Sequence, residues 1–217
     1  MIPAAIKQLI FPSDEVFYTL FNRGAAMVVK MSDCLNEILN ETDFSEDKWS
    51  SALAEMKLLY EDSQQNYRHS VKRLSRVFIT PIDRESVHQL AVDLHAVART
   101  IYLVPRSLTR HKEHLPDEYA KYLGHLLIKS TAELEKMVQD IGTTKRTFVM
   151  HHAKEIFAVK REMEITYDRA LQNLYQENFS PAQFIRKLEA YNSIKEVGDL
   201  CRNTANTAEG IVLTHVG

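Results

Sequence analysis

Apolar residues recur at three- to four-residue spacing along six stretches of the chain, and polar residues fill the positions between them. In the first stretch, residues 13–41, the apolar positions include Phe17, Phe21, Val28, Leu35 and Leu39. This period matches one face of an α-helix, and no segment shows the sustained alternation of a half-buried strand. The sequence therefore predicts an all-α protein, a six-helix antiparallel bundle that forms a single domain over residues 1–217.

The other five helices are expected at residues 43–78, 81–105, 116–142, 143–174 and 180–212. The stripe of the second stretch has a near-heptad rhythm, which predicts shallow packing angles of about 20° between neighbours. Pro105 is expected to kink or end the third helix, since proline lacks a backbone donor. Gly142 suits a left-handed residue just past the fourth helix.

Two of these boundaries share a hydroxyl residue followed by proline. Thr80 is an N-cap candidate, Pro81 takes the first helical position, and Asp83 falls three residues after the cap. The same device returns in Ser180-Pro181-Ala182-Gln183. A repeated corner between two long helices predicts two related three-helix halves, about 1–115 and 116–217.

Composition narrows the class of protein. The chain has 27 basic and 29 acidic residues and a formal charge of −2, which argues against attraction of its whole surface to nucleic acid or to a membrane. Cys34 and Cys201 fall in helical patterns, as buried thiols of a reducing compartment do. The N-terminus is a poor signal peptide, and no apolar run reaches the roughly 20 residues that cross a bilayer. We expect a cytoplasmic protein that is peripheral at most to a membrane.

Sequence motifs for chemistry are sparse. No nucleophile motif, phosphate loop or paired-cysteine motif occurs, so we expect no catalytic residues, no cofactor and no enzyme activity. His151 and Glu155 share a helix face and could form half of a metal site, although such residues more often face solvent. The basic stretch 106–114 reads as a solvated connector or a binding patch. Lys160 with Glu164, and Lys195 with Asp199, are ion pairs at i, i+4.

Two motifs resemble those of the PhoU-like regulators associated with Pit-type inorganic phosphate transporters. The first is F-I-T-P-I-D-R-E, with Phe78, Thr80, Pro81, Asp83, Arg84 and Glu85, after which Ser86 and Val87 depart from the family's Asp-Ile. The second is A-N-T-A-E-G-I-V-L at residues 205–213. The resemblance covers essentially the whole chain. It implies a PhoU-like fold and an accessory role in phosphate uptake.

The resemblance also implies metal, because the family places acidic pairs on neighbouring helices. In this chain those positions fall at Tyr60 and Gln64, at His95, Ala96 and Arg99, and at Lys160, Glu164, Lys195, Asp199 and Arg202. Clustered carboxylates need a cation, and here lysine and arginine can supply the positive charge. We therefore expect no metal, and a charge network of Arg99, Lys160, Glu164, Lys195, Asp199 and Arg202. A register slip in the fifth helix would make Glu162 the relevant acid instead.

The expected function is that of a non-enzymatic PhoU-like accessory protein that docks on a Pit-type phosphate transporter. The turn from Phe78 to Glu85 is the candidate docking site, although ordinary helix capping also explains it. The alternative is a helical-bundle scaffold protein that has lost both metal binding and the transporter. A metal-dependent enzyme in a ferritin-like bundle is disfavoured, since it needs Glu-x-x-His motifs. A homodimer is plausible, but no face is indicated.

Overall fold

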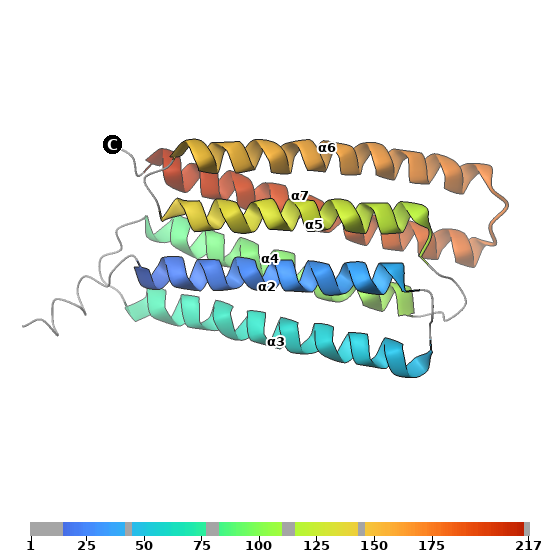
Figure 1. Ribbon diagram of the computed structural model, residues 1–217, viewed down its shortest axis with the longest axis horizontal. Helices are drawn as coiled ribbons and strands as arrows, with labels where there is room; N and C mark the ends of the chain where they lie inside the picture. Colours follow the sequence, from blue (N-terminus) through green and yellow to red (C-terminus); the bar gives the residue numbers. More distant parts are fainter. Residues whose placement is uncertain (1–14, 42–44, 77–82, 110–115, 143–145, 215–217) are drawn as a thin grey trace, which may run out of the picture.

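The described residues of this computed structural model are 15–41, 45–76, 83–109, 116–142 and 146–214, and they form six long helices (Figure 1). The helices are α2 (Glu15–Asn40), α3 (Glu46–Arg76), α4 (Arg84–Thr109), α5 (Glu118–Ile141), α6 (Arg146–Gln176) and α7 (Pro181–Thr214). Consecutive helices run antiparallel along one common axis. The predicted fold class, an all-α six-helix bundle, is confirmed.

The helices form two groups of three. Within each group, α2–α4 and α5–α7, every helix packs against the other two. The groups meet where α2 lies on α5 and α4 lies on α7, while α3 and α6 contact helices of their own group alone. The sequence analysis predicted halves of about residues 1–115 and 116–217. That the halves are related stays a prediction, to be tested by superposing residues 45–110 on 145–214.

The core follows the predicted apolar stripes. Phe17, Phe21, Leu90, Leu126 and Ile194 are among the residues that lose nearly all their exposed surface. The stripes face inward because burying each large apolar side chain stabilises the fold by about 1.5–3 kcal/mol. No described helix is both long enough and apolar enough to pass through a bilayer.

The two proline corners have different outcomes. Ser180 caps α7 as predicted: its hydroxyl accepts from the Gln183 amide at 3.3 Å, and the Gln183 side chain accepts from the Ser180 amide at 2.9 Å. At the first corner the described helix begins at Arg84, and the predicted cap Thr80 and first helical residue Pro81 lie outside the described residues. Asp83 acts as the cap instead of the third helical residue, because its carboxylate accepts from the Ser86 amide at 2.9 Å.

Three other boundary predictions need correction. Pro105 does not end α4, which continues to Thr109 with Val104 and Pro105 both buried. The helix predicted from residue 116 begins at Glu118, and Asp117 caps it by accepting from the Ala120 amide at 3.0 Å. Gly142 is right-handed, with φ −77° and ψ −1°. A Cβ at Gly142 would lie 3.1 Å from the Tyr18 ring, so close packing of that ring accounts for the glycine.

Candidate functional site

A cluster of four charged side chains joins α6 to α7 and forms the centre of the predicted charge network. The Lys160 ammonium lies 2.5 Å from Oε1 of Glu164 and 2.8 Å from Oδ1 of Asp199. Lys195 lies 3.1 Å from the other oxygen of Asp199. We call these four residues the Lys160 cluster. The Lys160–Glu164 contact lies within α6 and the Lys195–Asp199 contact lies within α7, whereas the Lys160–Asp199 contact joins the two helices.

Lys160 is unusual because its side chain is only 4% exposed. Burial by itself would lower its pKa, but the hydrogen bonds to Asp199 and Glu164 outweigh burial and raise the pKa above the ordinary value. Burial likewise opposes ionisation of Asp199, yet the bonds from Lys160 and Lys195 lower its pKa. The bond from Lys160 also lowers the pKa of Glu164. Lys160, Glu164 and Asp199 are therefore charged at neutral pH, and the two carboxylates are neutralised from within the protein.

Gly198 lets α6 and α7 approach closely enough for this arrangement. A Cβ at Gly198 would lie 2.7 Å from the Met163 sulfur and 3.8 Å from Cδ of Lys160. The glycine thus provides the space in which the lysine stem and Met163 pack.

The donor set of the Lys160 cluster does not fit a divalent cation. Hard cations take several oxygen ligands, whereas here an ammonium already occupies the position between two carboxylates. Among the described residues no group of three or more His, Cys, Asp or Glu side chains is arranged to hold a metal. His151 and Glu155, the sequence candidates for half a metal site, are both exposed.

Other members of the predicted network lie elsewhere. Arg99 and Arg202 are exposed, and neither makes an ion pair with a described residue. Glu162, the competing acid, accepts a hydrogen bond from the Tyr122 hydroxyl and therefore faces α5 instead of α7. The register that places Glu164 beside α7 is thus the one the structure has, and the network contracts to the four residues of the Lys160 cluster.

Aromatic rings fill the place between α3 and α4 at which the family resemblance implies acidic side chains. His95 of α4 stacks on Tyr67 of α3 with centroids 4.6 Å apart, and lies 6.0 Å from Tyr60. Tyr60 in turn stacks on Tyr102 at 4.3 Å, and the Arg106 guanidinium lies 4.5 Å from the Tyr102 ring. We call these four rings the ring stack. The signal for it was the spacing of seven between Tyr60 and Tyr67 and between His95 and Tyr102, which puts each pair on one helix face.

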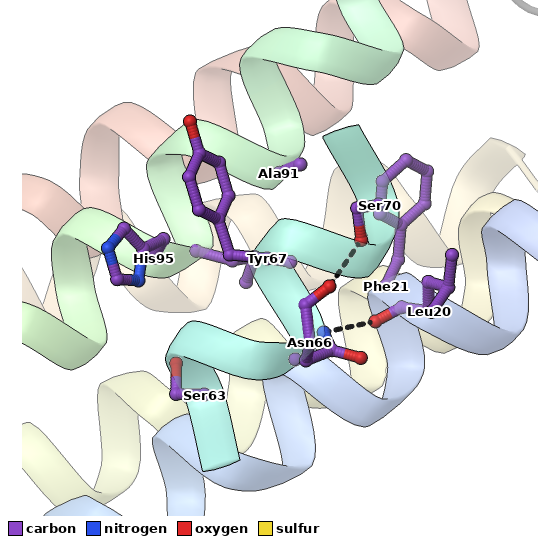
Figure 2. A pocket seen from close by; sticks show the side chains of 10 residues that line it. Leu20, Phe21, Ser63, Asn66, Tyr67, Ser70, Ala91 and His95 are labelled. Carbon is purple, nitrogen blue, oxygen red and sulfur yellow. Dashed lines mark hydrogen bonds between the residues drawn. The ribbon is translucent and has the colours of Figure 1, made fainter. Parts of the chain in front are cut away.

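A small cavity lies beside the ring stack (Figure 2). It has a volume of about 10 Å³, and Ser63, Asn66, Tyr67 and His95 are among its lining residues. The Asn66 amide donates to the Leu20 carbonyl at 2.9 Å and so ties α3 to α2. Oδ1 of Asn66 and Nδ1 of His95 are buried without a hydrogen-bond partner among the described residues. The cavity has room for about one water molecule, so it is a packing feature and not a substrate pocket.

Part of the motif at the first proline corner is described. Phe78, Thr80 and Pro81 lie outside the described residues. Asp83, Arg84 and Glu85 are all exposed, and they border a shallow groove together with Leu74 and His88. Apart from the capping carboxylate of Asp83, the motif therefore presents its charged side chains at the surface. Arg106 is exposed as well, while residues 110–114 of the basic stretch lie outside the described part.

A half-buried polar cluster at the start of α5 was missed by the sequence analysis. The carboxylate of Asp117 accepts hydrogen bonds from the Lys187 ammonium and the Tyr191 hydroxyl, which tie the start of α5 to α7. Burial alone would raise the pKa of Asp117, but these bonds lower it below its ordinary value of 3.8. No sequence spacing connects residue 117 with residues 187 and 191, so only the tertiary fold reveals this cluster.

Comparisons with known proteins agree with this architecture. No family model matches the sequence. The chain is 26% identical over 160 residues to the UPF0111 protein YkaA of Bacillus subtilis strain 168, which covers 71% of this chain and 76% of that protein. Two crystal structures of PhoU-like proteins from Shewanella oneidensis MR-1 each match with a TM-score of 0.76 at 12% identity, over 91% of this chain and 99% of theirs. The PhoU-like fold predicted from the motifs is confirmed.

Proposed function

We propose that this protein is a member of the PhoU-like family and acts as a non-enzymatic regulatory partner in inorganic phosphate transport. The observation that carries the proposal is the match of its fold, over nearly the whole chain, to a protein described as a PhoU-like phosphate regulatory protein. Fold alone does not establish function, but the two sequence motifs lie in the same chain and support the same family.

The finer part of the proposal is that the protein docks on the cytoplasmic side of a Pit-type transporter through the described end of the first motif. Arg84 and Glu85 are exposed there, next to the groove that includes Leu74 and His88. Charges of opposite sign at the rim of a partly apolar groove suit specific docking, because they fix orientation while the apolar surface is buried.

Co-purification tests the docking directly. A tagged Pit-type transporter from the same cell should retain this protein, and the charge swap Arg84→Glu/Glu85→Lys should release it. The matched control is Arg161→Glu/Glu155→Lys, which makes the same exchange at two exposed positions of α6. Loss of the gene should also change phosphate uptake. An unchanged uptake rate, or equal retention of the swapped and control proteins, would contradict the proposal.

A second candidate is a scaffold protein that has lost its transporter. The observation in its favour is that neither the Lys160 cluster nor the ring stack fits a metal, so the chain departs from the acidic pairs that the family resemblance implies. The two candidates differ in gene context. A Pit-type transporter gene beside this one favours the regulatory protein, and its absence together with unchanged phosphate uptake favours the scaffold.

A further inference from the structure

The second half of α3 presents a strip of positive charge to solvent. Residues 63–82 contain no acidic residue, whereas Arg68, His69, Lys72, Arg73 and Arg76 fall within nine positions and are all exposed. Arg68, Lys72 and Arg76 are spaced by four and therefore share one face of the helix. Because α3 packs only on α2 and α4, its outer side is free of other described helices.

Arg99 extends this strip onto α4. It is exposed and lies one helical turn after His95, whose ring stacks on Tyr67, the neighbour of Arg68 in α3. The positive charges of Arg99 and Arg68 both lower the pKa of His95. The acid nearest in sequence on α4, Asp93, is directed elsewhere, since it accepts from Gln89 at 2.7 Å and from Thr207 of α7 at 2.6 Å. We call Arg68, His69, Lys72, Arg73, Arg76 and Arg99 the cationic strip.

The charges of the strip are not neutralised by acidic residues in the described part of the protein. Arg68, Lys72, Arg73, Arg76 and Arg99 make no ion pair with any residue in the described ranges. Arg73 and Arg76 lie in the last turn of α3, where they also complement the negative end of the helix dipole. Arg68, Lys72 and Arg99 lie outside the last turns, so the dipole does not account for them.

We propose that the cationic strip binds anionic lipid headgroups at the membrane surface. The inference rests on the proposed function, since a partner of a transporter works beside the bilayer. Cytoplasmic loops of membrane proteins carry an excess of Lys and Arg, so they repel such a strip, whereas anionic lipids attract it. The net charge of −2 disfavours attraction of the whole surface to either polyanion, so the strip must act locally, and the proposed role beside a membrane favours lipid over nucleic acid.

The expected affinity is modest and depends on salt. Each Lys or Arg close to an anionic membrane contributes about 1 kcal/mol, and the effect falls off within a Debye length. The strip from residue 68 to residue 76 is about 12 Å long, at 1.5 Å per residue, and so spans several headgroups. Its role is therefore to orient and concentrate the bundle at the membrane, while the transporter supplies the specific contact.

Vesicle co-sedimentation of the full chain tests this inference. Wild-type protein should bind vesicles of phosphatidylcholine mixed with phosphatidylglycerol at low salt, and should not bind pure phosphatidylcholine. The variant Arg68→Gln/Lys72→Gln/Arg99→Gln should bind about 100-fold more weakly, since three charges are lost. The control Lys154→Gln/Arg161→Gln/Arg169→Gln removes three exposed charges from α6 and should bind like wild type.

Each other outcome overturns the inference. No wild-type binding to the anionic vesicles would remove it, and equal weakening of both variants would reduce it to a net-charge effect. Preferential binding of the strip to a duplex oligonucleotide would assign it to nucleic acid. The vesicles contain no transporter, so the result is independent of the docking test. Vesicle binding without co-purification would support lipid binding by the cationic strip and contradict docking on the transporter.

Discussion

Replacing Lys160 with methionine tests whether the Lys160 cluster is held by its internal cation. The ammonium contacts Glu164 on its own helix and Asp199 on α7, and the side chain is 4% exposed. Methionine keeps an unbranched apolar stem of similar length, so packing near Gly198 is largely retained. The substitution therefore removes the charge and its donors while it preserves most of the volume.

The expected magnitude lies between two limits. Removing one partner of a fully buried ion pair costs about 3–5 kcal/mol, and an exposed pair contributes less than about 1 kcal/mol. The Glu164 and Asp199 side chains are 51% and 41% exposed, so water can hydrate both after the change, and Asp199 retains Lys195. We expect the free energy of unfolding to fall by about 1–2 kcal/mol at pH 7, and Tm to fall by about 2–8 °C.

The assay is urea and thermal unfolding followed by circular dichroism, in buffer with a chelator so that stray metal does not contribute. Lys195→Met is the first control, because Lys195 is 29% exposed and its one ion pair with a described residue is with Asp199, at 3.1 Å. Its cost should stay below about 1 kcal/mol. Lys57→Met is the second control, because its pair with Glu61 is exposed and 3.7 Å long. Its cost should be near zero.

The ranking of the three variants decides the outcome. Equal stability of Lys160→Met and wild type would refute the reasoning, because the cluster would then be incidental to the fold. A cost for Lys195→Met as large as that for Lys160→Met would show that burial of the lysine adds nothing. A combined Lys160→Met/Asp199→Asn variant should lose less than the sum of the single changes, since the two residues interact directly.

Three further predictions follow from the same structure. Lys160→Glu places a third carboxylate beside Glu164 and Asp199, so the Tm of this variant should lie below that of Lys160→Met. Mn²⁺ should raise the Tm of the variant but not that of wild type. A Tm of the variant that Mn²⁺ leaves unchanged would count against a cation-sized space there. Asp117→Asn should cost about 1–3 kcal/mol at pH 7. The pKa of Asp117 is lowered in the folded protein, so the loss of stability in the variant is complete above the ordinary pKa of 3.8 and shrinks as pH falls through the folded pKa. A loss of stability that is the same at pH 7 and in strong acid would contradict this prediction. Gly210→Ala should raise the free energy of unfolding by about 0.5–1 kcal/mol, since a Cβ there would meet nothing within 4 Å. Gly124→Ala should lower it, since a Cβ there would lie 2.5 Å from Cδ1 of Leu39. Urea unfolding of both variants checks the opposite signs.

Local patterns predicted the fold class well, because each helix buries one stripe and the stripe is visible in the sequence. They were less reliable at helix ends. Ser180 was identified as a cap because it interacts with Gln183, three residues away. Pro105 was expected to interrupt α4, but the buried environment of Val104 and Pro105 favours continuation to Thr109. Tertiary packing thus outweighed local propensity at that position.

The candidate site shows the same division between local and long-range contacts. The pairs Lys160–Glu164 and Lys195–Asp199 follow from a spacing of four on one helix. The contact between Lys160 and Asp199, and the hydrogen bonds of Asp117, join residues on different helices, and no spacing within one segment encodes them. The cationic strip could have been found in the sequence, since five Arg, Lys or His residues in nine positions are visible there.

The two places at which the family resemblance implies acidic pairs are filled by different chemistry, and this bears on how regulation can work. Residues at the positions where the resemblance implies acidic pairs lie close together in the structure. Tyr60 faces His95 between α3 and α4, and Lys160 faces Asp199 between α6 and α7. Stacked rings carry no net charge that needs a cation, and a buried ammonium supplies one permanently at neutral pH. Neither set of side chains offers the cluster of oxygen ligands that a hard cation takes. On the proposed function, we therefore expect a signal to act at the surface, where the groove beside Arg84 and Glu85 and the cationic strip lie on the same pair of helices, α3 and α4.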